Sequence, residues 1–151
     1  MSLLCQAQFN NFKFENLDTV DGLSSSTCLT IFQDSEGFMW FGTIDGLNKY
    51  NGYEFEVYKS ILNNQSSISN NRINAIVEGA DGNLWIGTNN GLNYFNKKTN
   101  SFLRVDLYKQ LSLSNNPRKF INALLFDEES NALWVATNNG VIKIMLEDFN
   151  S

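Results

Sequence analysis

The sequence predicts an all-β fold of β-propeller blades: about three four-stranded antiparallel blades, which form a partial propeller. An eight-residue motif recurs three times along the chain, and each copy lies among short apolar segments separated by turns rich in Gly and Asn. No segment carries a helical hydrophobic period long enough to compete. Four-stranded units that recur at about 40–45 residues are typical of propeller blades.

The repeated motif begins with Trp40, which recurs as Trp85 after 45 residues (85 − 40) and as Trp134 after 49 (134 − 85). Packing between blades explains its residue types, because Trp fills the wedge between two sheets, Thr bonds across a strand end and Gly permits a tight turn. The alternative interpretation of the tryptophans is a carbohydrate-stacking platform. The predicted structural positions are Trp40, Thr43, Gly46, Trp85, Thr88, Gly91, Trp134, Thr137 and Gly140.

Each unit is expected to form a meander of strands. A first apolar strand is followed by the Trp strand and a third strand, and hairpin turns such as Asp81-Gly82 join them. First strands are predicted at 28–33, 73–78 and 120–127, third strands at 47–51, 92–96 and 141–145, and fourth strands at 53–58 and 101–107. The partial propeller is expected over 9–151, with an orphan outer strand at 9–15 and repeats at 22–59, 68–107 and 117–146. Residues 1–8 are interpreted as an artificial start or the end of a trimmed export signal.

Composition excludes several classes of function. The net charge is −5 and Lys and Arg form no stripe, which argues against a nucleic-acid face. The chain has no histidine, so a Ser-His-Asp triad or a His-containing zinc site is impossible within it. Cys28 lies in an apolar stretch and is predicted to be a buried free thiol. Glu128 and Glu129 share one turn instead of converging from separate blades. We therefore expect no catalytic residue, no metal site and no cofactor.

The pattern Asp-x-x-Gly-x-x-Trp-x-Gly-Thr-x-x-Gly-Leu-x-x-Tyr resembles the two-component regulator propeller repeat. The second unit departs from it at Gly79, where the pattern has Asp, and the third departs at Asn131 and at Ala136, where it has Gly. The first unit matches it at Asp34, Gly37, Trp40, Gly42, Thr43, Gly46, Leu47 and Tyr50.

In that family the repeats form the periplasmic sensor of hybrid two-component histidine kinases, especially in Bacteroidetes that sense glycans. The resemblance implies a non-catalytic, ligand-sensing, extracytoplasmic segment of an inner-membrane protein, with an oligosaccharide as its ligand. Kinase chemistry and membrane attachment would belong to other parts of such a protein. The alternative is a protein-interaction propeller scaffold without a glycan ligand.

Ligand contacts are expected from the loops that lead into the first strands of the second and third units. Their amide and cationic groups could bond sugar hydroxyls or acidic sugars. The alternative is a solvated loop in which Asn only shapes turns. The candidate residues are Asn70, Asn71, Arg72, Asn115, Arg118 and Lys119.

Three blades span too small an arc to close a ring, and this leaves an apolar face open at each end. We therefore expect copies of the chain to associate into a homodimer or ring. The simplest form is a two-fold pair in which each strand at 9–15 completes the third blade of the partner.

Overall fold

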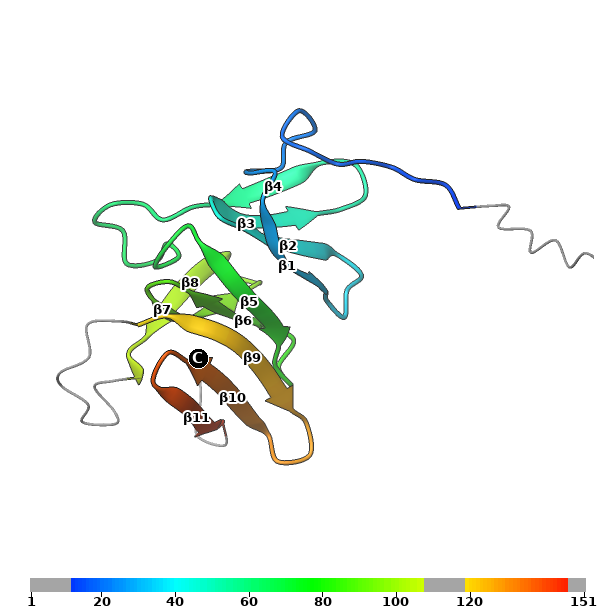
Figure 1. Cartoon of the computed structure of the whole chain (residues 1–151). Coiled ribbons are helices and arrows are strands. Elements are labelled where there is room, and N and C mark those ends of the chain that lie inside the picture. Colours follow the sequence, from blue (N-terminus) through cyan, green and yellow to red (C-terminus); the bar gives the residue numbers. More distant parts are fainter. Residues whose placement is uncertain (1–11, 108–118, 147–151) are drawn as a thin grey trace, which may run out of the picture.

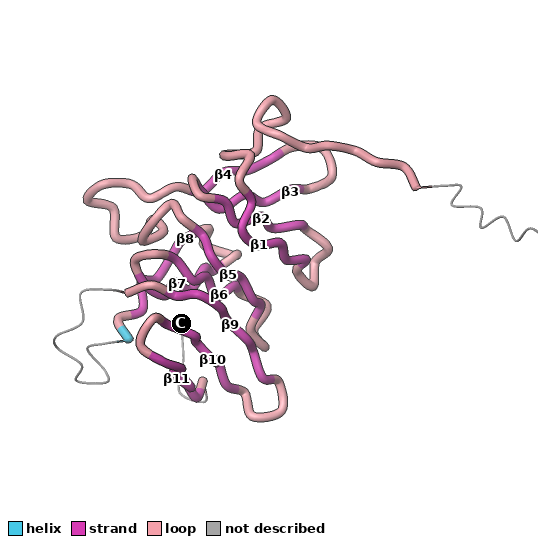
Figure 2. Tube along the Cα trace, in the orientation of Figure 1, coloured by secondary structure: helices cyan, strands magenta, loops and turns pink. Residues whose placement is uncertain are grey.

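Three antiparallel sheets follow one another along the chain in the computed structural model, which describes residues 12–107 and 119–146 (Figures 1 and 2). Blade 1 consists of β1 (Cys28–Gln33), β2 (Met39–Thr43), β3 (Gly46–Tyr50) and β4 (Phe55–Tyr58). Blade 2 consists of β5 (Ile73–Glu78), β6 (Leu84–Thr88), β7 (Gly91–Asn96) and β8 (Ser101–Val105). Blade 3 consists of β9 (Ile121–Asp127), β10 (Ala132–Thr137) and β11 (Gly140–Met145). The strands of each sheet pair in chain order, which confirms the predicted all-β blade architecture.

The predicted outer strand at 9–15 finds no partner in the part of the chain that the structure describes. Residues 12–15 have no strand assignment, and residues 9–11 lie outside the described residues. Phe12 and Phe14 are 74% and 90% exposed. Among the described residues, both rings are therefore largely uncovered.

The first strands β1, β5 and β9 lie side by side, where the three sheets converge (Figure 1). Two apolar cores fill the wedges between consecutive sheets. Trp40 belongs to the core between blades 1 and 2, and Trp85 belongs to the core between blades 2 and 3. Their exposed fractions are 0% and 1%. Each of these tryptophans therefore packs between blades.

The two free faces of the array behave differently from its interior. Trp134 occupies the repeat position of Trp40 and Trp85 on blade 3 but is 37% exposed. Lys143 Nζ lies 5.0 Å from the centre of its ring, but among the described residues no further blade packs on that side of blade 3. The prediction that Cys28 is buried was wrong, since its side chain is exposed on β1. Both exceptions have the same cause: no neighbouring blade among the described residues covers these two faces.

A threonine closes the hairpin between the second and third strands of every blade. Thr43 Oγ1 donates a hydrogen bond to the Gly46 carbonyl at 3.1 Å and accepts one from the Asp45 amide at 3.0 Å. Thr88 and Thr137 form the same pair of bonds in blades 2 and 3. The glycine of each turn has a positive φ, which is 146° at Gly46, and this explains the Thr-x-x-Gly spacing.

The glycine two residues after each buried tryptophan provides space for the following blade. A Cβ atom at Gly42 would lie 2.5 Å from Thr30 Cγ2 of its own blade and 2.7 Å from Ile73 Cγ2 of the next, and one at Gly87 would lie 2.5 Å from Ile121 Cγ2. Ile73 and Ile121 are fully buried at the start of the next first strand. A side chain at either glycine would clash with the isoleucine of the next blade, and at Gly42 also with Thr30 of its own blade.

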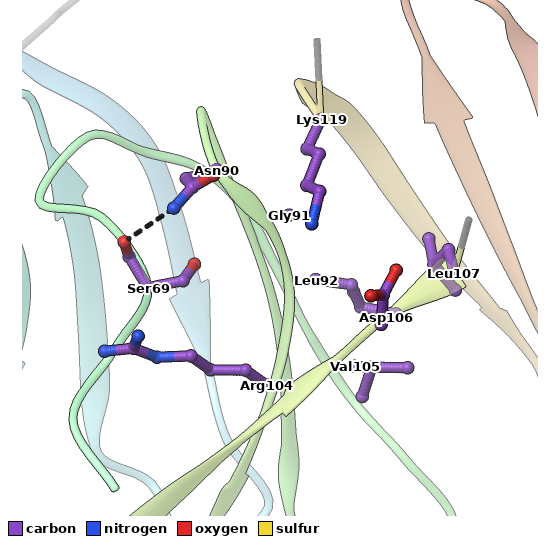
Figure 3. Close-up of a pocket in the computed structure, with 9 residues that line it drawn as sticks. All are labelled: Ser69, Asn90, Gly91, Leu92, Arg104, Val105, Asp106, Leu107 and Lys119. Carbon is purple, nitrogen blue, oxygen red and sulfur yellow. Dashed lines mark hydrogen bonds between the residues drawn. The ribbon is translucent and has the colours of Figure 1, made fainter. Parts of the chain in front are cut away.

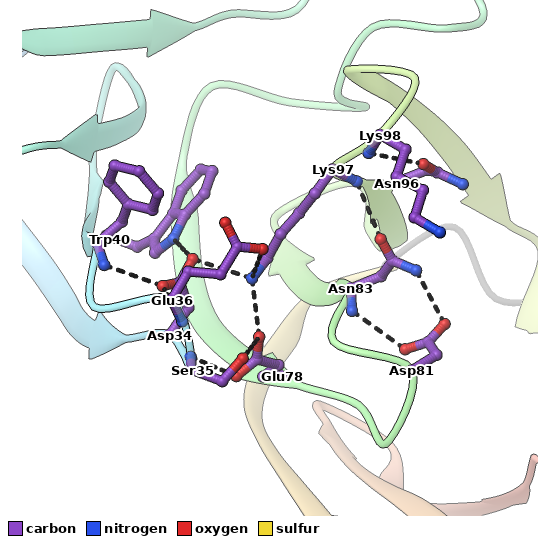
Figure 4. A network of polar contacts seen from close by, with 11 residues as sticks. Asp34, Ser35, Glu36, Trp40, Glu78, Asp81, Asn83, Asn96, Lys97 and Lys98 are labelled. Carbon is purple, nitrogen blue, oxygen red and sulfur yellow. Dashed lines mark hydrogen bonds and ion pairs between the residues drawn. The ribbon is translucent and has the colours of Figure 1, made fainter.

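Lys97 joins blades 1 and 2 at the end opposite the threonine hairpins (Figure 4). Its Nζ lies 3.0 Å from Asp34 Oδ2 and 2.8 Å from Glu78 Oε1. Glu78 in turn accepts a hydrogen bond from the Ser35 amide at 2.8 Å, and Asp34 accepts one from Trp40 Nε1 at 2.8 Å. Asp34 is fully buried, so this network pairs its charge instead of leaving it isolated.

Acidification is expected to weaken the Lys97 network. Burial raises the pKa of Asp34, but hydrogen bonds from Trp40, Lys97 and the Phe38 amide outweigh burial and hold the pKa below its usual value. Such a group stabilises the fold above its unfolded-state pKa of about 3.9, and the contribution disappears as pH falls through the folded-state pKa. At pH values below about 4, we expect the urea concentration of half-unfolding to decrease as the pH decreases. In Asp34→Asn this decrease should be less steep. If the urea midpoint of Asp34→Asn depended on pH as steeply as that of the unsubstituted chain, this assignment would be contradicted.

Candidate functional site

One end of the array, which we call the loop face, carries the threonine hairpins together with the segments that lead into β5 and β9. Hydrogen bonds join the blade 2 hairpin to the segment before β5: the Asn89 amide donates to the Arg72 carbonyl at 3.3 Å, and Asn90 Nδ2 donates to the Ser69 carbonyl at 3.3 Å. Lys119, before β9, lines the same cavity as Asn90. The described candidate ligand residues therefore lie on the loop face. They are Asn70, Asn71, Arg72 and Lys119.

A buried asparagine fixes the incoming loop of blades 1 and 2, and sequence reasoning missed it. Asn93 accepts the Ser69 amide at 2.9 Å and donates to Ser69 Oγ at 2.9 Å, and Ser69 Oγ also bonds Thr88 Oγ1. Asn48 makes the same contacts to Ser24 in blade 1. The available signal was the 45-residue interval (93 − 48), which equals the interval between the first two tryptophans. Ile142 replaces this asparagine in blade 3.

The predicted ligand residues Asn70 and Asn71 are already engaged within the protein. Asn71 Oδ1 accepts the Ser60 amide at 2.7 Å, and its Nδ2 donates to Asp45 Oδ1 at 3.1 Å. Asn70 Oδ1 accepts the Arg72 amide at 2.9 Å, an Asx turn. The hydrogen bond from Lys59, opposed by slight burial and assisted by Asn71, holds the pKa of Asp45 below its usual value. Both asparagines shape the loop that carries them.

Arg72 and Lys119 are the predicted residues with free cationic groups. Within residues 12–107 and 119–146, neither side chain forms a hydrogen bond or an ion pair. Arg72 is exposed immediately before β5, and Lys119 is half-buried two residues before β9. Since β5 and β9 are adjacent, both cations lie at the same end of neighbouring first strands. The other two predicted residues, Asn115 and Arg118, lie outside the described residues.

A cavity of about 310 Å³ opens on the loop face between blades 2 and 3 (Figure 3). Its polar lining includes Lys119, whose ammonium group is directed into the space, together with Asp106 and Asn90. The full lining is Ser69, Asn90, Gly91, Leu92, Arg104, Val105, Asp106, Leu107 and Lys119.

Arg104 contributes its stem to the cavity, but its guanidinium group points away from it. The Nε atom donates to the Ser67 carbonyl at 3.0 Å, and Nη2 donates to the Asn64 carbonyl at 3.0 Å. These bonds hold the segment between β4 and β5 against β8. Lys119 is therefore the cation of this cavity that has capacity for a ligand.

Two other features are missing from the described residues. No group of three or more His, Cys, Asp or Glu side chains is arranged to hold a metal ion there. The same part of the chain has no helix with the length and apolar character needed to cross a bilayer.

The repeats match a known family of propeller sequences. The family model described as two component regulator propeller matches residues 22–45 and 67–90, which cover the loop, first strand and Trp strand of blades 1 and 2. Two stretches of the chain are thus similar to two-component regulator propeller repeats, and both lie on propeller blades. Histidine kinase P4 from Formosa agariphila is 41% identical over 69 residues, which are 46% of this chain and 5% of the kinase.

Solved structures share the fold. The extracellular domain of a putative one-component system from B. thetaiotaomicron aligns with a TM-score of 0.61 and 24% identity, over 79% of this chain and 16% of that chain. PorZ, a surface component of the type-IX secretion system of Porphyromonas gingivalis, aligns with a TM-score of 0.60 and 16% identity, over 79% of this chain and 17% of its own. The chain therefore spans a small part of the proteins that it resembles.

Proposed function

We propose that this chain is a non-catalytic, ligand-sensing segment of a hybrid two-component sensor regulator and that its ligand is an oligosaccharide. The observation that carries the proposal is the family match on two consecutive blades, together with the similarity of 69 residues of the chain to a histidine kinase. The solved relative from B. thetaiotaomicron is an extracellular domain, which supports an extracytoplasmic, periplasmic location for this segment. Phosphotransfer would then be the task of another part of the parent protein.

The loop face favours an acidic oligosaccharide over a neutral one. Its predicted amides are occupied by turn contacts, whereas the cations of Arg72 and Lys119 are free among the described residues. Guanidinium and ammonium groups pair with carboxylate or sulfate groups, and Lys119 points into a cavity that one sugar ring can enter. The ligand chemistry that fits is a uronic acid or sulfated sugar.

A glycan array followed by calorimetric titration tests this assignment. With an acidic oligosaccharide from the array, Lys119→Glu and Arg72→Glu should each weaken binding at least tenfold, about 1.4 kcal/mol, because each replaces attraction by repulsion. Asn70→Ala should change the affinity less, since Asn70 bonds its own loop. Lys98→Glu is the matched control, because Lys98 is an exposed cation at the opposite end of blade 2 (Figure 4).

Two outcomes would count against the proposal. Equal affinity for all four variants and the unsubstituted chain would exclude the loop face as the site. An array on which the chain binds no glycan would favour the alternative, a propeller that contacts a protein instead.

A further inference from the structure

One position on the loop face carries a carboxylate in blade 1 and an amide in blade 2. Asp45 and Asn90 each precede the turn glycine of their hairpin, and the backbone amide of each donates to the hairpin threonine at 3.0 Å. The two residues are therefore equivalent in the repeat. Their side chains have similar size, but the carboxylate is charged and only accepts hydrogen bonds, whereas the neutral amide also donates them.

Two further positions belong to each boundary between blades. The outer strands β4 and β8 end at the same register, opposite the residue that follows the turn glycine, so the next residues, Lys59 and Asp106, are equivalent. The first strands β5 and β9 start at the same register, opposite the hairpin threonine of their own blade, so Asn71 and Lys119, each two residues earlier, are equivalent. We call the two sets the first trio and the second trio: Asp45, Lys59 and Asn71, and Asn90, Asp106 and Lys119.

The first trio is closed by its own carboxylate. Lys59 Nζ donates to Asp45 Oδ2 at 2.6 Å, and Asn71 Nδ2 donates to Asp45 Oδ1 at 3.1 Å. Both carboxylate oxygens of Asp45 are thus engaged, one by each end of the segment that joins β4 to β5. The cation of this trio is therefore paired within the protein.

The second trio has the same three kinds of group in a different order, and no carboxylate closes it (Figure 3). Asn90 Nδ2 donates to the Ser69 carbonyl at 3.3 Å. Lys119 forms no hydrogen bond or ion pair with a residue of the two described ranges, and its ammonium group is directed into the cavity of about 310 Å³. Asp106 lines the same cavity. The hairpin of blade 2 therefore supplies Lys119 with no carboxylate.

We propose that Asn90 determines the specificity of this cavity for an acidic ligand, an inference that rests on the proposed function. The acidic group of the ligand binds Lys119 in the place that corresponds to the Asp45 carboxylate of the first trio. A carboxylate at position 90 would pair with Lys119 and exclude that group. The uncharged amide of Asn90 leaves Lys119 to the ligand.

Asp106 narrows the chemistry of the ligand. An ionised carboxylate accepts hydrogen bonds and donates none, so on the lining of the cavity it receives those of hydroxyl groups. An acidic group for Lys119 and neighbouring hydroxyl groups for Asp106 occur together on one ring of a uronic acid. The ligand class that fits both residues is therefore an oligosaccharide of uronic acids.

Calorimetric titration with oligogalacturonate tests the role of Asn90. Asn90→Asp transfers the carboxylate of the first trio to the second and should raise the dissociation constant at least about tenfold, because the new carboxylate competes for Lys119. The variant is expected to fold, since Asp45 occupies the same hairpin position in blade 1. Asn90→Ala adds no charge, so its dissociation constant should stay at least about threefold below that of Asn90→Asp.

Asn139→Asp is the matched control on blade 3. Asn139 takes the same hairpin position, with its amide donating to Thr137 Oγ1 at 3.1 Å, and it is exposed and absent from the cavity lining. Its substitution should leave the dissociation constant within about twofold, because solvent screens the distant charge. Equal losses of affinity in Asn90→Asp and Asn139→Asp would indicate a general charge effect and overturn the proposal. Unchanged affinity in Asn90→Asp would overturn it as well.

Lysine acetylation provides a second test that needs no sugar. An ammonium group that gains a carboxylate partner is held in its protonated form and reacts more slowly, because less of the free amine is present. With acetic anhydride at neutral pH, mass spectrometry should show Lys119 reacting at least about threefold more slowly in Asn90→Asp than in the unsubstituted chain. Lys98, an exposed lysine at the opposite end of blade 2, is the internal reference and should react equally in both.

The two measurements separate this inference from the proposed function. Slower acetylation of Lys119 in Asn90→Asp, with no binding of oligogalacturonate by any of the proteins, would uphold the closure of the second trio by a carboxylate and overturn the sugar ligand. Binding by the unsubstituted chain, with equal acetylation of Lys119 in both proteins, would leave the proposed function in place and overturn the role of Asn90.

Discussion

Replacing Trp85 with alanine should lower the free energy of unfolding by about 3–5 kcal/mol. The indole is 1% exposed and forms the centre of the core between blades 2 and 3. Its ring lies 5.0 Å from that of Tyr94, so the substitution removes an aromatic pair and leaves a cavity that two sheets cannot close.

Urea unfolding at neutral pH measures this effect, with Tyr53→Ala as the control. Tyr53 is an aromatic residue of similar size that is 94% exposed, so its loss should cost less than about 0.5 kcal/mol. A cost below about 1 kcal/mol at Trp85, with loss of sugar binding, would instead favour the stacking-platform interpretation of the repeated tryptophans.

Gly87→Ala should destabilise the chain by about 1–3 kcal/mol, a large effect for one added methyl group. The new Cβ would lie 2.5 Å from Ile121 Cγ2 and 2.9 Å from Ile121 Cβ. Ile121 is fully buried on the next blade and has no open space to move into. The clash must therefore be relieved by separating blades 2 and 3.

A double-mutant cycle identifies the source of this cost. In an Ile121→Ala background the penalty of Gly87→Ala should shrink by at least about 1 kcal/mol, because the γ2 methyl group is gone. Ala136→Gly is the matched control at the equivalent position of blade 3, and it should cost about 0.5–1 kcal/mol through backbone entropy alone. Additive penalties at positions 87 and 121 would show that the glycine serves some other purpose.

The sequence predicted the blades well because their determinants are local and repeated. The spacing from Trp40 to Trp85 and the turn chemistry at Asp81-Gly82 are visible in the chain itself. First strands were predicted within one residue of their positions, whereas the fourth strands proved shorter than predicted. Outer strands pair along one edge only, so fewer residues fix where they end.

Contacts between blades were harder to predict, because they join residues that no motif links. The burial of Cys28 was misjudged since its apolar neighbours do not show that β1 lies on a free face. Asn71 was predicted to contact ligand, yet its bonds to Asp45 and to the Ser60 amide depend on a loop path that the sequence does not specify. The bridge from Lys97 to Asp34 spans 63 positions (97 − 34) and left no local signal.

Chemical-shift mapping of the isotope-labelled chain tests the functional account most directly. On titration with an acidic oligosaccharide such as oligogalacturonate, we expect the largest amide shifts around Arg72, Lys119 and Asn90 on the loop face, and smaller shifts with a neutral xylo-oligosaccharide. Largest shifts at the opposite end, around Ser35 and Lys98, or equal responses to the acidic and neutral sugars, would contradict the account.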